Sequence, residues 1–370
     1  MKVLQLIQKP QLRGAEIFAC QLSQELIQRG IEVDIVYLFN HDPFALKFKL
    51  NFVPLSANVN RRLWDWNAYK RLNGIINKGK YDIVQANAAD TLKYAILSRL
   101  LFGWKARIVF RNASLMGRLM YSPLQKIYNR FLLRHCDSVV SVSENCRKDL
   151  IKFFPEANKK SLTIPIGAYL TDTSESAVHP RNGEGPIFLH IGSFVWEKNH
   201  QFLITIFSKY LERYGRGVLW LVGDGKLKES VEAEVAQLGL QNNVMFWGAR
   251  QDTISFLKSA DLLVFPSVVE GVPGVILESL ASGTPVLASD AGGIPEILVH
   301  GVNGHCLSSF SEDNYVESMH TLTTDQALRF RLVAAGKETI MASFDMKKIA
   351  SRFNDYYQSI SARNVNVDHG

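Results

Sequence analysis

The chain has 370 residues, of which 47% are apolar and 21% charged. This ordinary globular composition excludes a disordered chain or a collagen, and the length favours two domains. Residues 1–165 hold 26 basic and 12 acidic side chains, whereas residues 166–370 hold 16 and 23. A basic first half followed by an acidic second half suggests two domains with different electrostatic partners.

Two other features limit the possible class of protein. The first residues, MKVLQLIQKPQLRGAE, contain too short an apolar run for a signal peptide, and no stretch of 18 apolar residues follows. We therefore expect a cytoplasmic chain that is at most peripheral on the inner face of the plasma membrane. The four scattered cysteines form no CxxC pair, so neither a zinc site nor a disulfide framework is indicated.

Short β-branched runs alternate with helical patterns along the whole chain. In the first half, strands are expected at Val3–Ile7, Glu32–Phe39, Asp82–Ala86, Ala106–Arg111, Asp137–Val142 and Leu162–Pro165, with helices at Ala15–Arg29 and Leu119–Arg134. In the second half, strands are expected at Ile187–Ile191, Val218–Val222, Val244–Trp247, Leu262–Pro266 and Pro285–Ser289. Nearly apolar strands that are separated by helices predict parallel sheets covered on both faces.

The polar stretch Thr171–Gly185 is typical of a linker. We therefore predict an α/β fold of two doubly wound, Rossmann-like domains over residues 1–170 and 186–344. A final helix is expected over residues 345–360. Doubly wound sheets bind ligands at the carboxyl ends of their strands, so we expect the two edges to face each other across an active-site cleft.

Two strand-to-helix turns carry candidate anion sites. Gly14 follows the first strand and opens a helix, where free backbone N–H groups attract anions. Lys198 stands just before the helix that begins near His200, after the strand FLHIG. Alone, Gly14 also fits an ordinary turn glycine and Lys198 a solvated lysine. No GxGxxG fingerprint occurs, which disfavours a nicotinamide oxidoreductase.

The segment Ala260–Ser289 contains two glutamates that are separated by seven residues. Glu270 lies in the loop after a buried strand, and Glu278 lies about one turn inside the following helix. Two carboxylates with anion-binding amides between them suit an anionic ligand that also has hydroxyl groups, such as a sugar nucleotide. The spacing alone is equally compatible with two surface glutamates.

These residues resemble the retaining glycosyltransferases of family 4, which have the two-domain GT-B fold. The E-x7-E element Glu270–Glu278 stands in S-x-x-E-G-V-P-x-x-x-L-E-x-x-A-x-G-x-P-V. Around it are matching short motifs in the expected order: R-G-A-E (13–16), K-N (198–199), G-D-G (223–225), F-W-G (246–248), G-x-P-E-I (293–297) and G-x-N-G (301–304). The resemblance covers residues 1–310. It implies that residues 1–170 form an acceptor-side domain, on which the final helix packs, and that residues 186–344 form the nucleotide-sugar donor-binding domain.

The resemblance implies a role for each matching position. Glu270 would hold the donor sugar, Glu278 the nucleotide ribose, and Lys198 the leaving diphosphate. Further donor-binding positions would be Gly14, Ser193, Gly248, Arg250, Asp252, Val272, Pro273, Gly274 and Val275. The family keeps the anomeric configuration and needs no metal or other cofactor. The chain has no Asp-x-Asp pair, so lysine and helix N-termini would have to stabilise the departing charge.

Two positions depart from the family pattern. Ser193 stands where an arginine is common, so Arg13 or Arg250 would have to replace half of a cationic clamp. Asn112 stands where the first domain usually offers a histidine, and an amide can bind a sugar hydroxyl but cannot act as a base. We expect activity to survive, because the leaving phosphate can accept the proton of the acceptor.

The acceptor side is basic. Residues 91–136 contain nine lysines and arginines with no aspartate or glutamate, interleaved with large apolar residues such as Tyr94, Leu101, Trp104 and Tyr121. This pattern suits an anionic membrane surface or a lipid-linked acceptor, or else apolar core residues among solvated cations. No nucleic-acid-binding module is present, so nucleic acid is not expected as a partner.

The leading hypothesis is a metal-independent, retaining transferase that moves a sugar from a nucleotide donor to a glycan or lipid-linked acceptor in the synthesis of a bacterial surface polysaccharide or lipopolysaccharide. Because of Asn112 and Ser193, a catalytically silent GT-B subunit that binds sugar nucleotide or lipid stays open. A GT-B epimerase that acts on the sugar nucleotide itself stays open as well.

Overall fold

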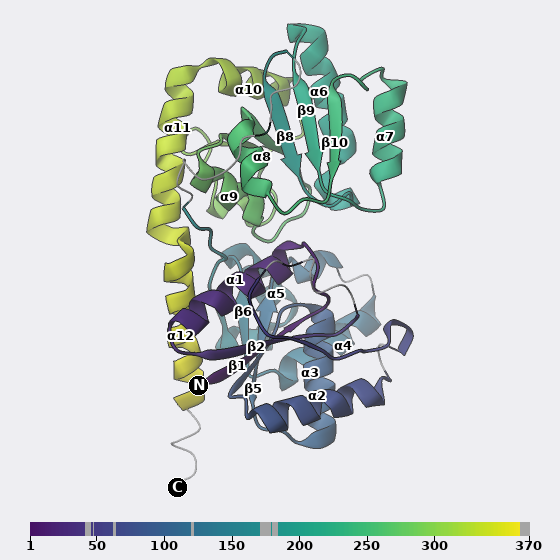
Figure 1. The fold of residues 1–370 in the computed structure, drawn as a ribbon, viewed down its shortest axis with the longest axis vertical. Helices are drawn as coiled ribbons and strands as arrows, with labels where there is room; N and C mark the ends of the chain where they lie inside the picture. Colours follow the sequence, from purple (N-terminus) through teal and green to yellow (C-terminus); the bar gives the residue numbers. More distant parts are fainter. Residues whose placement is uncertain are drawn as a thin grey trace. The chain divides into compact units, whose positions relative to one another are not determined.

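The computed structural model describes residues 1–40, 46, 48–61, 64–119, 122–170, 179 and 184–362. The chain divides into two compact units, of which the first comprises Met1–Ile166 with Met346–Gly370 and the second Gly167–Asp345 (Figure 1). Apart from 179, 184 and 185, the stretch interpreted as a linker lies outside the described residues.

The first unit is built on a seven-stranded sheet in the order β3-β2-β1-β4-β5-β6-β7, in which every neighbouring pair is parallel. Its strands are β1 (Lys2–Ile7), β2 (Glu32–Tyr37), β3 (Phe52–Pro54), β4 (Ile83–Ala86), β5 (Arg107–Asn112), β6 (Ser138–Ser141) and β7 (Ser161–Thr163). Its helices are α1 (Gly14–Gln28), α2 (Trp66–Gly79), α3 (Ala89–Phe102), α4 (Pro123–His135), α5 (Glu144–Phe153) and α12 (Met346–Ala362), with short turns η2 (Val59–Arg61), η3 (Met116–Leu119) and η4 (Pro155–Lys160).

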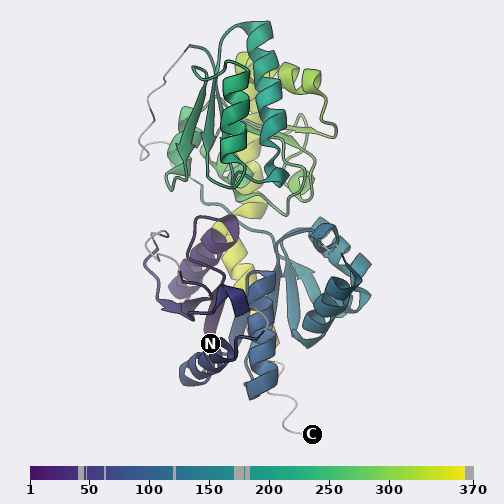
Figure 2. The same ribbon diagram turned by 90° about the vertical axis from the view of Figure 1, so that its right-hand side faces the viewer.

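Both faces of this sheet are covered, which explains why its strands are almost continuously apolar. Leu4 of β1 belongs to one buried cluster with Leu72 of α2 and Ile96 of α3. Ile7 of the same strand belongs to a second cluster with Ala19 of α1. Figure 2 shows helices on both sides of the strands. Burial on two faces removes the polar alternation of a half-exposed strand.

The final helix packs on the first unit, as predicted. Phe353 of α12 lies against Phe18 of α1 with ring centroids 5.9 Å apart. The Tyr357 hydroxyl donates a hydrogen bond to Gln85 in the middle of the sheet. The Arg352 guanidinium donates to the backbone oxygen of Thr163 at 2.9 Å. Apolar and polar contacts therefore both fix α12 on this domain.

The second unit has a six-stranded sheet in the order β10-β9-β8-β11-β12-β13, again entirely parallel. Its strands are β8 (Ile187–Ile191), β9 (Val218–Val222), β10 (Val244–Gly248), β11 (Leu262–Phe265), β12 (Val286–Ser289) and β13 (His305–Leu307). Its helices are α6 (His200–Tyr214), α7 (Lys228–Gln237), α8 (Thr253–Ser259), α9 (Gly274–Ser282), α10 (Glu312–Thr324) and α11 (Gln326–Thr339), with short segments η5 (Trp196–Lys198), η6 (Ile294–Glu296) and η7 (Ile340–Phe344).

The predicted class, two Rossmann-like parallel-sheet domains, is confirmed. The sequence did not predict β3 and β13, whereas the equally short edge strand β7 was predicted as Leu162–Pro165. Strand β3 contains a proline and β13 has no β-branched residue, so neither carries a strand signal. The helix expected over Leu119–Arg134 begins at Pro123, because the Ser122 hydroxyl caps it by accepting from the Gln125 N–H. Among the described helices, none has the length and apolar character needed to cross a bilayer.

Candidate active site

Lys198 and Glu270 meet at one edge of the second sheet. Lys198 ends the loop after β8, and Glu270 lies in the loop after β11, which is the neighbouring strand. The carboxyl ends of parallel neighbours share an edge. A backbone bond from the Val268 N–H to the Glu197 carbonyl at 2.8 Å joins the two loops. The Lys198 Nζ lies 2.5 Å from Oε1 of Glu270.

This ion pair is mostly withdrawn from water. The Lys198 side chain is 20% exposed and that of Glu270 is 11% exposed. The ammonium also lies 4.6 Å from the ring centroid of Phe265, a cation–π distance. Breaking such a pair by removing one partner leaves a poorly solvated charge, so the two groups depend on each other. The edge therefore holds a cation and a carboxylate beside each other in a fixed geometry.

Two glycines of the loop after β12 contact the backbone at Glu270 and Gly271. Gly292 has a φ of +59°, and a Cβ at this position would collide with the backbone oxygen of Glu270. The next residue, Gly293, donates its N–H to the Gly271 carbonyl at 2.8 Å. The loop after β12 thus packs directly on the loop that carries Glu270, and only glycine allows this approach.

The start of α9 supplies backbone N–H groups next to Glu270. The helix begins at Gly274, its N-cap residue is Pro273, and no side chain caps it. The predicted stretch Val272–Val275 therefore spans the N-cap residue and the first two residues of a helix whose dipole favours negative charge. The helix begins four residues after Glu270 in the chain.

Glu278 lies one turn further along α9 and contacts the first residue of α8. Its carboxylate accepts a hydrogen bond from the Thr253 hydroxyl at 3.3 Å. Burial raises the pKa of Glu278, and the bond from Thr253 opposes this shift. A raised pKa favours the protonated carboxyl, which can donate as well as accept hydrogen bonds.

The contact with Thr253 brings Glu278 to the predicted base-binding stretch. Gly248 ends β10 at an irregular register, with φ at +66°. The Arg250 guanidinium binds the Asp252 carboxylate through two bonds of 2.9 and 3.0 Å. This pairing lowers the pKa of Asp252. Arg250 is therefore already bound to Asp252. To replace the missing clamp arginine, it would have to leave this ion pair.

The loop that contains Ser193 is followed by two buried rings, those of Phe194 and His200. Ser193 is half-buried, and its carbonyl accepts from the Val195 N–H at 2.8 Å. Beneath it, His200 stacks on Phe194 with ring centroids 4.2 Å apart. Burial, and secondarily the charge of Lys198, lowers the pKa of His200 to about 4. The histidine is therefore a neutral packing element at ordinary pH.

Gly14 and Asn112 lie at the carboxyl edge of the first sheet, and their surroundings differ. Gly14 is exposed, and a Cβ added there would meet nothing within 4 Å. Packing therefore does not require this glycine, which leaves room for a ligand. Asn112 is buried, and its amide donates to Ser141 Oγ at 3.3 Å and to the Cys146 carbonyl at 3.2 Å. The Asn112 amide thus joins β5, β6 and α5.

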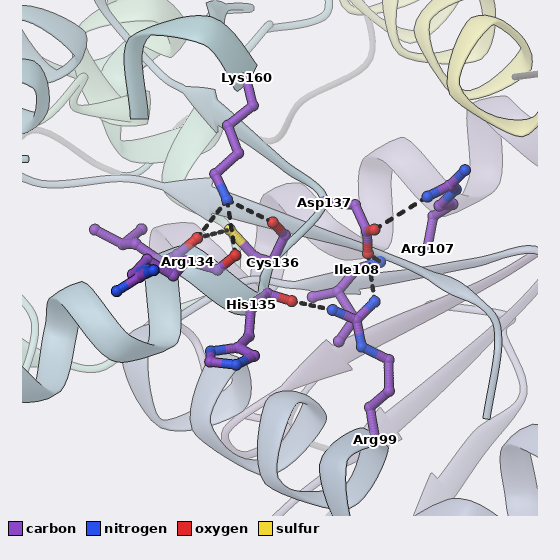
Figure 3. A network of polar contacts seen from close by, with 9 residues as sticks. Arg99, Arg107, Ile108, Arg134, His135, Cys136, Asp137 and Lys160 are labelled. Atoms are coloured by element: carbon purple, nitrogen blue, oxygen red, sulfur yellow. Dashed lines mark hydrogen bonds and ion pairs between the residues drawn. The ribbon is translucent and has the colours of Figure 1, made fainter. Parts of the chain in front are cut away.

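The described cations of residues 91–136 lie in different surroundings. Four take part in ion pairs: Lys93 with Asp90, Arg99 and Arg107 with Asp137 (Figure 3), and Arg130 with Glu156. Arg111 is buried, with its guanidinium 4.3 Å from the ring centroid of Phe18. Lys105, Lys126 and Arg134 are exposed, and the side chain of Arg118 lies outside the described residues.

The apolar residues of this segment also separate into two groups. Tyr94 and Trp104, expected as candidates for a surface, are buried in the core. Leu100 and Leu101 are exposed, whereas Tyr121 lies outside the described residues. Sequence alone does not distinguish these groups, because burial depends on what packs against each helix.

Three residues of the site carried no predicted role. Thr253 binds Glu278, Gly292 supports Glu270, and Phe265 lies beneath Lys198. The glycine pair at 292–293 was a usable signal, since adjacent glycines favour a close backbone approach. Thr253 and Phe265 have no local signature, and only the fold brings them to the site.

Two family models match the chain in succession. The model described as Glycosyltransferase Family 4 matches residues 12–171, and the model described as Glycosyl transferases group 1 matches residues 171–339. An uncharacterized glycosyltransferase of Methanocaldococcus jannaschii is 26% identical over 375 residues, which cover 94% of this chain and 95% of that protein. The lipopolysaccharide core biosynthesis glycosyltransferase LpsE of Rhizobium meliloti is 30% identical over 170 residues, 46% of this chain and 49% of LpsE.

A solved structure is similar over nearly the whole chain. Anabaena HepE in complex with UDP-glucose superposes with a TM-score of 0.83 at 18% identity, covering 97% of this chain and 100% of HepE. This likeness confirms the fold, which is GT-B.

Proposed function

We propose that this chain, a glycosyltransferase of the group 1 and family 4 type, transfers a sugar from a nucleotide-sugar donor with retention of the anomeric configuration and without a metal. The observation that carries the proposal is the Lys198–Glu270 ion pair, which lies at the sheet edge beside the uncapped start of α9. A cation and free helical amides suit a diphosphate, and an adjacent carboxylate suits sugar hydroxyls.

The donor would extend from Lys198 and the start of α9 to the stretch Gly248–Asp252. Its diphosphate would bind Lys198 and the N–H groups of the first turn of α9, and Gly14 would leave room for it on the first domain. Binding of the diphosphate would take Lys198 away from Glu270 and free this carboxylate for the sugar hydroxyls. Glu278 would bind the ribose, and the stretch Gly248–Asp252 would border the base.

In the transfer step, the bond from the anomeric carbon to the diphosphate oxygen breaks. The acceptor oxygen forms its bond to the same face of the sugar, and its proton passes to the leaving phosphate oxygen. This route does not require a histidine at position 112. Lys198 and the α9 amides would stabilise the charge that develops on the leaving group.

The acceptor that we propose is a glycan or a lipid-linked glycan of a bacterial surface polysaccharide or lipopolysaccharide. The name of LpsE supports a role in such a process, and the HepE complex supports a UDP-sugar as donor. The chain would act in the cytoplasm at the inner face of the membrane, with cations of residues 91–136 close to anionic lipids.

The decisive experiment combines donor binding with product analysis. A thermal-shift screen of UDP-, GDP- and ADP-sugars identifies the donor, because a ligand that binds the native state raises the unfolding temperature. We expect Glu270→Ala to keep the fold but lose about 10²–10³-fold in turnover. Undiminished turnover in this variant would refute the site. Donor binding without transfer would indicate a silent subunit, and an altered sugar nucleotide formed without acceptor would indicate an epimerase.

A further inference from the structure

His179 contacts one face of helix α8, although it belongs to the stretch interpreted as a linker. Its backbone N–H donates to Oγ of Ser259 at 2.7 Å. Its imidazole lies on the ring of Phe256, with the centroids 3.9 Å apart, and its Nε2 lies 3.2 Å from Oδ2 of Asp252. These partners follow a spacing of i, i+4 and i+7, which places them on one face of a helix. His179 thus reaches from the last residue of α8 to its N-cap residue.

The imidazole completes a cluster of aromatic rings. The rings of Trp220 on β9, Trp247 on β10 and Phe256 lie with their centroids 5.5, 5.9 and 5.1 Å apart. His179 lies 6.3 Å from Trp220 and 5.5 Å from Trp247, and its side chain is 17% exposed. Aromatic pairs in such tilted and edge-on arrangements stabilise each other beyond the area that they bury. The imidazole is therefore part of the packing and not a solvated side chain.

Asp252 connects His179 to the stretch that is predicted to border the base. Oδ2 of Asp252, which lies beside the imidazole, also accepts from Nη2 of Arg250 at 3.0 Å. The Arg250 guanidinium lies 5.7 Å from the ring centroid of Phe256. Arg250 and His179 thus contact the same carboxylate and the same ring, so a shift of one changes the surroundings of the other.

The same helix carries a contact to the predicted ribose site. Thr253, the first residue of α8, donates to the Glu278 carboxylate. In addition, the ring of Trp247 belongs to the strand that ends at Gly248, where the register is irregular. Such irregularities are common next to active sites, because they redirect side chains. His179 therefore contacts both the helix and the strand that lead to the predicted nucleoside contacts.

We propose that His179 is a positioning residue of the donor site, which holds α8 so that Asp252 and Thr253 stay in place for the nucleoside part of the donor. The inference rests on the proposed function, in which the stretch Gly248–Asp252 borders the base and Glu278 binds the ribose. His179 acts through Asp252 and the aromatic cluster and does not touch the donor. A residue of the predicted linker thereby contributes to donor affinity.

The test is nucleotide binding by the full chain, measured by isothermal titration calorimetry with UDP, GDP and ADP. The nucleotide that the parent chain binds most tightly is then used for every variant. His179→Ala should raise the Kd about three- to thirtyfold, within the range of couplings between residues in contact. With the corresponding nucleotide sugar, KM should rise while kcat changes by less than about twofold, since nucleoside contacts are equal in the ground state and the transition state.

Conservative variants separate the two contacts of the imidazole. His179→Phe keeps an aromatic ring on Phe256, and His179→Gln keeps a polar group near Asp252. Each should bind with a Kd between that of the parent chain and that of His179→Ala. Combining His179→Ala with Asp252→Ala should cost less than the product of the separate losses, because His179 acts through Asp252. Losses that multiply fully would overturn this route.

His320→Ala is the matched control for the loss of a stacked imidazole. His320 on α10 lies on the ring of Tyr214 with the same centroid distance, 3.9 Å. Tyr214 is the last residue of α6, a helix that begins beside Lys198, so this pair lies away from the carboxyl edge of the sheet. The control should lower the unfolding temperature about as much as His179→Ala and keep the Kd of the parent chain. An equal loss of affinity in both variants would show a merely structural effect and would overturn the proposal.

Failure of the proposed function would give a different result. If the parent chain binds one nucleotide and His179→Ala binds it equally well, the positioning role is refuted and the donor site stands. If the parent chain binds none of the three nucleotides, the donor site is wrong and the inference is refuted with it. A chain that binds a nucleotide and transfers no sugar would still show the loss of affinity in His179→Ala, which would support the inference and refute the transferase.

Discussion

The ammonium of Lys198 lies 2.5 Å from the Glu270 carboxylate, and the two side chains come from loops after adjacent strands. Each group neutralises the other in a place that water reaches poorly. The pair therefore couples the predicted diphosphate contact to the predicted sugar contact.

The first prediction tests this coupling. Lys198→Met and Glu270→Gln should each lower turnover by about 10²–10³-fold, because each removes a charge that acts on the transition state. The double variant should lose less than the product of the two single losses, since residues in contact are not additive. Steady-state rates of the four proteins measure the coupling. Fully multiplicative losses would show that the two groups act independently.

The second prediction concerns the close backbone approach at Gly292. Gly292→Ala should destabilise the chain by more than about 2 kcal/mol and reduce turnover, because the new Cβ must displace the Glu270 backbone. Gly301→Ala is the matched control, since Gly301 also has a positive φ, +73°, but no atom lies within 4 Å of its Cβ position. The control should lose only about 1 kcal/mol, the cost of left-handed backbone. Equal denaturant midpoints for the two variants would argue against the contact.

The third prediction concerns Gly14. Because its surroundings are open and its φ is not in the left-handed region, Gly14→Ala should leave the unfolding temperature equal or slightly higher while donor turnover falls. Gly74→Ala serves as the control, because Gly74 lies inside α2 with open space around it. This control should raise stability by about 0.5–1 kcal/mol and keep full turnover. If both variants keep full turnover, Gly14 does not adjoin the donor.

The fourth prediction is a pH dependence of stability caused by His200. Its pKa is lowered to about 4, so between this value and about 6.5 the unfolded chain binds the proton and the folded chain does not. The free energy of unfolding should therefore decrease as pH falls through this window, by an amount of the order of 3 kcal/mol. His200→Phe should remove this part of the slope, whereas His300→Gln, at an exposed position of the same domain, should retain it. Urea titrations at several pH values provide the measurement.

The sequence by itself determined the fold class, because nearly apolar strands between helices can only be buried in parallel sheets with two covered faces. It also determined which residues to examine at the edge of the second sheet, since the motif from Ser267 to Pro285 carries Glu270 and Glu278 in a local order. The edge strands β3 and β13 were missed because one contains a proline and the other has no β-branched residue, whereas the equally short β7 was predicted.

Only the tertiary structure decided how the side chains pair. Lys198 and Glu270 are 72 residues apart, so their ion pair follows from the order of β8 and β11 in the sheet. Tyr94 and Leu124 are both large and lie in the same basic segment, yet one is core and the other is 77% exposed. Composition cannot separate them, because burial is decided by what packs on each helix. The order of the strands therefore decides which motif residues meet, and the packing of the helices decides which apolar residues are buried.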